Sequence, residues 1–215
     1  MKKEYRTVSK LAEAEIEEKK SRFIATVKPV STEEEAQEFI NEMKKRYWDA
    51  THNVYAYYIE GEAAIQKFSD DGEPSGTAGL PVLEVLKKAQ VQDLVVVVTR
   101  YFGGTLLGAG GLVRAYSRSA SAGIEAAGIV KKQLCIQAVV IVEYALLGKI
   151  QNLLSANNYM VKDIVYGQDA EMIVYVPVDC IERFRQLVDD ATNASAVIEI
   201  GEELYVGIPS EDASG

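Results

Sequence analysis

The sequence predicts an α+β protein built of two domains, and three observations support this class. The chain has 215 residues, which is enough for two ordinary domains. Its 48% hydrophobic and 26% charged residues are typical of a globular protein. Segments with strand-like alternation and segments with helical periodicity follow one another along the whole chain. We expect one domain over residues 1–132, a second over residues 133–208, and a disordered tail at residues 209–215.

The first domain is expected to begin with strands and a helix. Residues 7–30 supply one or two strands, with the basic patch Lys19-Lys20-Ser21-Arg22 between or inside them. Ser31 and Thr32 each precede a glutamate by three residues, which is the capping-box pattern of a helix start. The helix that follows has an apolar stripe at Ala36, Phe39, Ile40 and Met43.

Three further strands are predicted in this domain. Residues 52–59 and 63–68 form a strand pair that turns at residues 60–62. Residues 94–101 are almost continuously apolar, so we expect a strand that is covered on both of its faces.

Two further helices accompany these strands. Thr77 or Ser75 is predicted to cap a helix with Pro81 in its first turn, where the missing N–H costs little. A glycine-rich loop leads into a second helix of small residues, over roughly residues 110–127.

The second domain has the element order βαββαβ. Strands are predicted at residues 134–142, 160–166, 172–176 and 197–206. Apolar residues at helical spacing between Leu146 and Leu154 predict the first helix, and Asp179 is expected to cap the second. This order is the split-βαβ or ferredoxin-like arrangement.

Charge, cysteine content and hydropathy limit the classes of protein. The net charge is −9, but residues 1–132 carry 19 basic and 19 acidic residues, so the excess lies in the second domain. A diffuse phosphate-binding field is therefore not expected there, whereas a local anion site in the first domain stays open. No apolar run approaches the roughly 20 residues of a membrane-spanning helix, and no secretory signal is expected. Two cysteines without CxxC spacing favour the cytoplasm.

The segment Asp70-Asp71-Gly72-Glu73-Pro74-Ser75-Gly76-Thr77-Ala78-Gly79 is the first candidate site. Its three carboxylates are broken by glycine and proline, so it must be a constrained loop before a helix. Adjacent carboxylates repel one another unless a cation or an arginine compensates them. We favour a functional site over a solvated turn, with Asp70, Asp71 and Glu73 as weak candidates for metal ligands and Ser75 and Thr77 for anion contacts.

The loop after the strand at residues 94–101 is the second candidate. A strand, a glycine-rich loop and a helix start present backbone N–H groups to an anion. Glycines that merely permit tight packing are the alternative, and the guanidinium groups at both ends favour a site. The candidate anion-binding residues are Arg100, Gly103, Gly104, Gly108, Gly110, Gly111 and Arg114. Lys20 and Arg22 are further candidates.

His52 is the only histidine, which excludes a multi-histidine metal site. A packed, hydrogen-bonded role is the more common one for such a residue, and proton transfer is the alternative. His52, Asp71 and Glu73 are therefore the catalytic candidates if the protein is an enzyme.

These motifs resemble the Impact family in its bacterial YigZ-type branch. The resemblance rests on residues 70–79 (DDGEPSGTAG), 100–104 (RYFGG) and 107–116 (LGAGGLVRAY) and covers essentially the whole chain. It implies a first domain with the fold of ribosomal protein S5 domain 2, and a second domain similar to the last domain of elongation factor G. Eukaryotic Impact proteins regulate translation initiation by interfering with activation of a stress kinase. These eukaryotic proteins carry an additional N-terminal RWD domain, so their interaction partner is not implied for this chain. The bacterial branch has no settled activity.

Two functions remain for these residues. The first is a translation-associated regulatory or binding protein that contacts the ribosome or RNA phosphates through the first domain, or a translation-related protein through the acidic second domain. It needs no cofactor. The alternative is an enzyme acting on a phosphate-containing small molecule, in which Mg²⁺ lies at Asp70, Asp71 and Glu73 and the glycine loop and Arg114 hold the phosphate.

Overall fold

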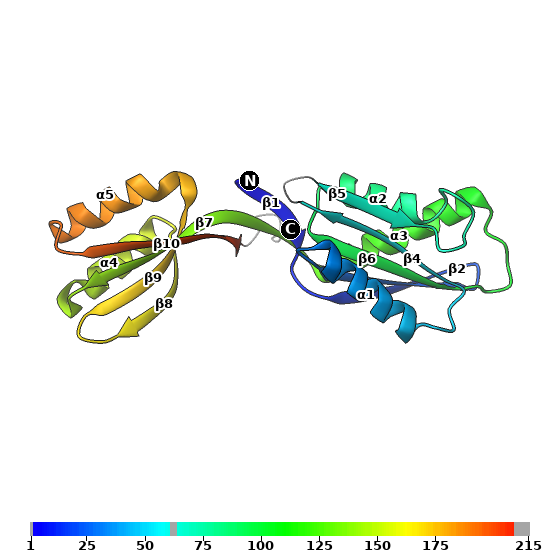
Figure 1. Cartoon of the computed structure of the whole chain (residues 1–215), viewed down its shortest axis with the longest axis horizontal. Helices are drawn as coiled ribbons and strands as arrows, with labels where there is room; N and C mark the ends of the chain where they lie inside the picture. Colours follow the sequence, from blue (N-terminus) through cyan, green and yellow to red (C-terminus); the bar gives the residue numbers. More distant parts are fainter. Residues whose placement is uncertain (1, 61–63, 209–215) are drawn as a thin grey trace. The chain divides into compact units, whose positions relative to one another are not determined.

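The structure is a computed structural model and describes residues 2–60 and 64–208. Two compact units lie within these residues, one of residues 5–131 and the other of residues 2–4 together with 132–208. Each unit mixes helices with a sheet, so the predicted α+β class is confirmed (Figure 1). The predicted tail at residues 209–215 lies outside the described residues.

The first unit is built on a five-stranded antiparallel sheet. The strand order is β2 (Ala12–Glu18), β3 (Ser21–Pro29), β6 (Leu94–Tyr101), β4 (His52–Ile59) and β5 (Ile65–Ser69). The predicted bounds of β4 and β6 are confirmed. The predicted turn at residues 60–62 falls largely outside the described residues, and β5 begins two residues later than expected.

The prediction of one or two strands over residues 7–30 is confirmed, because β2 and β3 lie within this range. A further strand, β1 (Glu4–Val8), begins before the range and overlaps it only at Thr7 and Val8. Lys19 and Lys20 form the turn between β2 and β3, with φ of 47° and 65°. Two consecutive positive φ values match the twist of antiparallel strands, which is why such turns close two-residue hairpins. The basic patch is thereby divided between the turn and the start of β3.

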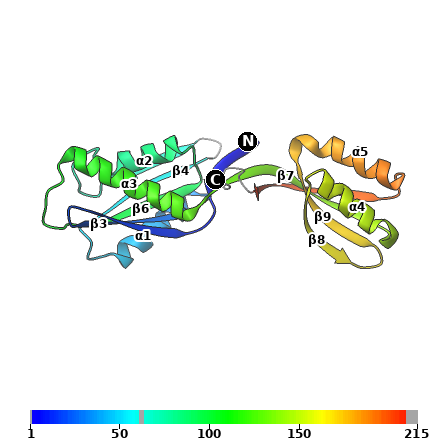
Figure 2. The same cartoon turned by 180° about the vertical axis from the view of Figure 1, so that it is seen from behind.

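Helices cover both faces of this sheet. Helix α1 (Glu33–Arg46) packs on one face, where Val95 and Val97 of β6 point. Helices α2 (Gly79–Lys88) and α3 (Ala109–Ala127) pack on the other, against Val96 and Val98 (Figure 2). The prediction that β6 is covered on both faces is confirmed, because alternate side chains of this apolar strand enter two separate cores.

The start of α1 also agrees with the sequence. Thr32 is its N-cap and accepts a hydrogen bond from the Glu35 backbone N–H at 3.2 Å. The Glu35 carboxylate in turn accepts from the Ser31 N–H at 2.7 Å. The cap is a local contact, so the pattern of nearby residues was sufficient to predict it.

The second unit has the predicted βαββαβ order. Its elements are β7 (Ile129–Val142), α4 (Tyr144–Ala156), β8 (Met160–Tyr166), β9 (Ala170–Pro177), α5 (Ile181–Thr192) and β10 (Val197–Ile208). The strand order is β10-β7-β9-β8, and β1 also pairs with β7. The two helices bury Ile150, Leu154, Phe184 and Val188 against the sheet.

One capping prediction in this unit is wrong. Helix α5 begins after Cys180, with no side-chain cap, because Val178–Cys180 forms a short 3₁₀ turn before it. The Asp179 carboxylate instead accepts from Lys3 Nζ at 2.8 Å. A partner distant in sequence has replaced the expected local one.

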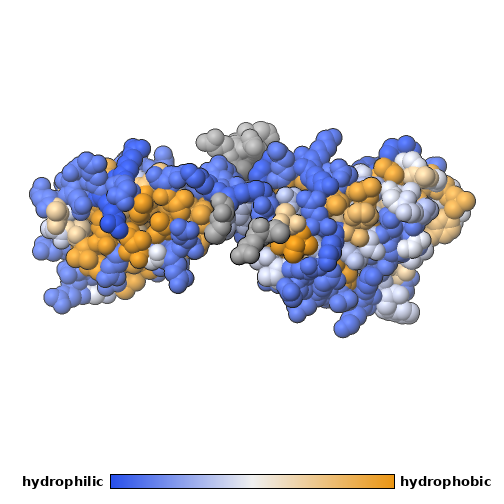
Figure 3. All heavy atoms as spheres, turned by 45° about the horizontal axis from the view of Figure 1, so that its top comes forward, coloured by the Kyte–Doolittle hydropathy of each residue, from blue (hydrophilic) through white to orange (hydrophobic). Residues whose placement is uncertain are grey.

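The hydropathy of the surface is mixed. Figure 3 shows a mostly hydrophilic surface that apolar patches interrupt on both units. The exposed apolar side chains of the first unit include Trp48, Phe102 and Leu106, which all lie in loops. None of the helices in the described part of the chain combines the length and the apolar character needed to cross a bilayer.

Candidate functional site

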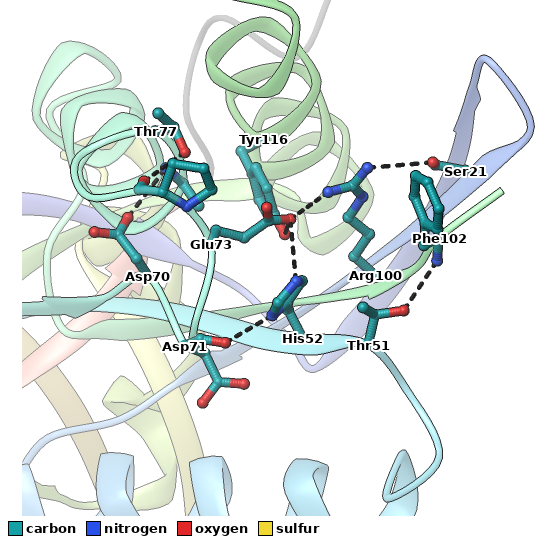
Figure 4. A network of polar contacts seen from close by, with 12 residues as sticks. Ser21, Thr51, His52, Asp70, Asp71, Glu73, Thr77, Arg100, Phe102 and Tyr116 are labelled. Atoms are coloured by element: carbon teal, nitrogen blue, oxygen red, sulfur yellow. Dashed lines mark hydrogen bonds and ion pairs between the residues drawn. The ribbon is translucent and has the colours of Figure 1, made fainter. Parts of the chain in front are cut away.

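A buried ion pair between Glu73 and Arg100 lies at the centre of the site (Figure 4). Arg100 is near the end of β6 and Glu73 is in the loop before α2. Arg100 Nη1 lies 2.5 Å from Glu73 Oε1, and the two side chains are only 6% and 4% exposed. Burying two charges is costly, so such a pair persists only where further hydrogen bonds satisfy both groups.

Tyr116 supplies one of these hydrogen bonds from α3. Its hydroxyl donates to Glu73 Oε1 at 2.8 Å, and the residue is fully buried. Burial raises the pKa of Tyr116 far above its ordinary range, and the negative charge of Glu73 raises it further. Tyr116 therefore stays protonated and acts as a permanent donor to the carboxylate.

Ser21 and two aromatic rings complete the surroundings of Arg100. Ser21 Oγ accepts from Arg100 Nη2 at 3.4 Å and from the Gly103 N–H at 3.1 Å. The guanidinium lies 5.3 Å from the centre of the Phe23 ring and 5.6 Å from that of Phe102. Such aromatic contacts stabilise a desolvated cation.

His52 is oriented by a main-chain carbonyl. Its Nδ1 lies 2.7 Å from the carbonyl oxygen of Asp71, which can only accept a hydrogen bond. The hydrogen of a neutral imidazole is therefore assigned to Nδ1, and Nε2 keeps a free lone pair. Nε2 lies 3.9 Å from Glu73 Oε1. In its neutral form His52 thus presents an acceptor beside the buried carboxylate, and in its protonated form it pairs with that carboxylate.

Asp70 has a structural role that the sequence did not indicate. Its carboxylate accepts from the N–H groups of Gly76, Ala78 and Gly79, at 2.8, 3.1 and 2.8 Å. It thus satisfies the N–H groups of the N-cap residue Ala78 and of Gly79, the first residue of α2, from outside the helix. The predicted caps are wrong, because Thr77 Oγ1 donates instead to the Pro74 carbonyl at 2.6 Å, and α2 has no side-chain cap from Ser75.

Asp71 faces away from both of the other carboxylates. It accepts from Lys44 Nζ at 2.9 Å and from the Asn53 N–H at 2.6 Å. Asp70, Asp71 and Glu73 therefore point to three separate sets of partners. Within residues 2–60 and 64–208, no three potential ligands of the His, Cys, Asp and Glu types gather around one point.

The loop from Phe102 to Gly108 is held against neighbouring segments at its start. The Phe102 N–H donates to Thr51 Oγ1 at 3.0 Å. A Cβ on Gly103 would lie 2.1 Å from the carbonyl of Lys20, so only glycine permits this approach. Gly104 and Gly108 have φ of 81° and 71°, which also favours glycine. Gly110 and Gly111 lie in the first turn of α3.

A cavity of about 440 Å³ opens beside the ion pair. Polar residues and the apolar side chains of the glycine loop and α3 line it: Thr51, His52, Gly72, Glu73, Pro74, Arg100, Phe102, Leu106, Leu107, Gly108, Ala109 and Leu112. The structure thus brings together His52, Glu73, Arg100 and Gly108 of the predicted site residues. Ser75, Thr77, Asp70, Lys20, Arg22 and Arg114 are not part of the lining.

Three of the predicted cations, Lys20, Arg22 and Arg114, lie on the exposed surface. Arg22 is paired with Glu15, with Nε and Oε1 2.9 Å apart. Lys20 and Arg114 have no ion pair or hydrogen bond within the described part of the chain, so Arg114 does not pair with Asp70 or Asp71. The arginine that does meet a carboxylate of the acidic segment is Arg100.

Three residues of the network were missed from the sequence. Tyr116 lies in a helix of small residues. Its large polar side chain on the buried face is the one feature of the sequence that could have indicated a role in the site. Ser21 stands between lysines and arginine and is fully buried. Thr51 precedes the predicted strand. Nothing in the sequence alone connects these three residues with Glu73 or Arg100.

The chain is similar to known proteins over most of its length. The chain matches the Impact N-terminal domain over residues 19–124 and a domain of unknown function (DUF1949) over residues 140–195. It is 47% identical to the IMPACT family member YvyE of Bacillus subtilis over 202 residues, covering 94% of this chain and 93% of that protein. The Dictyostelium discoideum protein IMPACT homolog is 40% identical over 97 residues, 43% of this chain and 28% of that protein.

A solved structure is similar over nearly the whole chain. It is the crystal structure of a hypothetical protein, 28% identical, which covers 92% of this chain and 97% of its own with a TM-score of 0.61. The matched range 19–124 contains the whole network of Ser21, His52, Glu73, Arg100 and Tyr116. The sequence resemblance is confirmed: the chain belongs to the Impact family.

Proposed function

We propose that this protein is a translation-associated regulatory protein that contacts phosphates of the ribosome or of RNA through its N-terminal unit. The observation that carries this proposal is a set of exposed cations without partners at the two ends of the glycine loop. Family membership supports it, because the eukaryotic members of the Impact family regulate translation initiation.

The cations are positioned by the backbone. Lys19 and Lys20 stand on the turn that packs against Gly103, at the start of the loop. Arg114 lies one turn into α3, with Nη1 3.7 Å from where a Cβ on Gly110 would be. All three are exposed and have no ion pair within the described residues. Unpaired cations of this kind can bind phosphate without first losing another partner.

The second unit suits a different contact. Residues 133–215 carry 13 acidic and 4 basic residues, which favours a basic protein such as a ribosomal protein as the partner of this unit.

We also propose that the two units have the ribosomal protein S5 domain 2 and ferredoxin-like folds, and that the protein works in the cytoplasm. The element and strand orders of the second unit support the ferredoxin-like assignment.

Co-sedimentation with ribosomes tests the proposal. We expect association at low salt that weakens as salt rises, because phosphate contacts release counterions. A variant with Lys20→Gln and Arg114→Gln should bind more weakly and with a smaller salt dependence. Lys45→Gln is the matched control, because it removes an exposed cation from α1 on the opposite face of the sheet. Association no stronger than that of an unrelated acidic protein would overturn the proposal.

One observation favours an enzyme as the second candidate function. His52 presents a free acceptor to the cavity beside Glu73, as a general base would. Asp70, Asp71 and Glu73 point to separate sets of partners. A Mg²⁺ ion at this site would therefore be bound by only one of these three carboxylates. Stabilisation by Mg²⁺ that Asp71→Asn abolishes would favour this alternative, and indifference to metal and phosphate compounds would count against it.

A further inference from the structure

We propose that the cavity beside His52 and Glu73 binds a single nucleotide, either a free mononucleotide or one nucleotide of single-stranded RNA. This inference rests on the proposed function, and it names the group that the N-terminal unit recognises. The cavity volume of about 440 Å³ lies within the range of roughly 300–1,000 Å³ in which small-molecule sites fall. Four features of its walls match the ribose, the phosphate and the base of a nucleotide.

The first feature is an oriented hydrogen-bond acceptor. The Asp71 carbonyl fixes the His52 ring through Nδ1, so that Nε2 is free to accept. The His52 side chain is 19% exposed and lines the cavity. A ribose hydroxyl or an N–H group of a base is the kind of donor that Nε2 can receive.

The second feature is an incompletely satisfied cation. Arg100 lines the cavity and is 5% exposed, and its Nε has no hydrogen-bond partner within the described residues. Its two terminal nitrogens are held by Glu73 and Ser21. Buried donors are almost always paired, so the orphaned Nε marks Arg100 as a cation of the cavity wall that the described residues leave incompletely satisfied.

The third feature is the start of α3, which forms another wall. Gly108 and Ala109 line the cavity, and α3 has neither a side-chain cap nor an acidic residue in its first turn. The unsatisfied N–H groups and the positive end of the helix dipole favour a phosphate there. Together with the acceptor and the orphaned Nε on the other walls, this places the anionic part of the ligand beside Gly108.

Apolar side chains provide the surface for the base. Leu107 and Leu112 line the cavity, and the Phe102 ring is 46% exposed at the same site. Bases stack on exposed aromatic rings, with a gain that depends little on sequence. The Arg100 guanidinium lies over the Phe102 ring, which places this aromatic surface next to the ion pair.

Calorimetric titration of the full chain tests the inference. The probes are the four ribonucleoside monophosphates and a pentamer of single-stranded RNA. We expect at least one probe to bind. Phe102→Leu should weaken that binding about fivefold or more through lost stacking, and His52→Asn by a similar factor. Asparagine keeps a donor for the Asp71 carbonyl but removes Nε2. Lys45→Gln should leave the affinity unchanged.

The outcomes separate this inference from the proposed function. Binding of a monophosphate identifies a free nucleotide as the source, and binding of the pentamer alone identifies RNA; both support the inference if they depend on Phe102 and His52. Absence of binding by every probe overturns the inference, as does binding that both variants retain.

Ribosome association that depends on Lys20 and Arg114 but not on Phe102 would preserve the proposed function while the cavity inference fails. Equal thermal midpoints of Phe102→Leu and the parent chain would show that the variant is folded.

Discussion

Arg100 donates to Glu73 across 27 positions of the sequence, and both side chains are more than nine-tenths buried. The contact joins the end of the central strand to the acidic loop before α2. Because Tyr116 donates to the same carboxylate oxygen, the pair also fixes α3 to this loop. One carboxylate therefore holds together three elements that surround the cavity.

The ion pair predicts a strong energetic coupling. Glu73→Gln and Arg100→Met should each lower the free energy of unfolding by about 3–5 kcal/mol, because each leaves one buried group without its partner. The double variant should lose less than the sum of the two losses. Urea unfolding of the four proteins measures the coupling, and additive losses would contradict the interaction.

The cap at α2 gives a second prediction. Asp70→Ala removes the acceptor of three backbone N–H groups and should lower the free energy of unfolding by about 1–2 kcal/mol. Ser75→Ala is the matched control at an exposed position of the same loop, and its effect should stay within about 0.5 kcal/mol. Chemical denaturation measures the free energy of unfolding of both variants. A larger loss in Ser75→Ala than in Asp70→Ala would show that Ser75 is the cap of α2.

The close approach at Gly103 predicts a position that tolerates no side chain. Gly103→Ala would place Cβ against the carbonyl of Lys20, so we expect a loss of about 1–3 kcal/mol or more. Gly148→Ala in α4 is the control, since nothing lies within 4 Å of its added Cβ. Alanine is the better helix former, so this variant should gain up to about 1 kcal/mol. Thermal unfolding of both variants should move in opposite directions.

Tyr57 predicts a loss of stability in alkali. Burial raises its pKa from 10.0 to about 12, and the hydrogen bond to Glu33 adds to the effect. The unfolded chain releases this proton at a lower pH than the folded chain does. The stabilisation is therefore complete below pH 10 and is lost as the pH rises towards 12.

Tyr57→Phe removes this titration and should flatten the pH dependence of stability in that window. Denaturant unfolding at several alkaline pH values, together with the ultraviolet absorbance of phenolate, measures it. Tyr47, whose pKa is also raised to about 12 by burial, remains in the variant, so part of the slope should persist. An unchanged slope in Tyr57→Phe would contradict the assignment.

The sequence by itself determined the elements whose structure depends on near neighbours. Strands β4, β6 and β8 have the predicted bounds, because the apolar pattern of a strand can be read from its own residues. The Thr32 cap of α1 follows from residues within four positions of one another. Both motif segments that the sequence singled out contribute residues to the lining of the cavity, but the sequence left open whether they form one site.

Only the tertiary structure decided which side chains meet. The sequence suggested that the three carboxylates of the acidic loop act together and that Arg114 belongs with them. In the fold, Asp70 caps α2, Asp71 meets Lys44, and Glu73 meets Arg100. A backbone turn between neighbours can send their side chains in opposite directions, and the sheet register brings Arg100 opposite His52 from 48 positions away. Partners of this kind are fixed by the packing of distant elements, which no local pattern records.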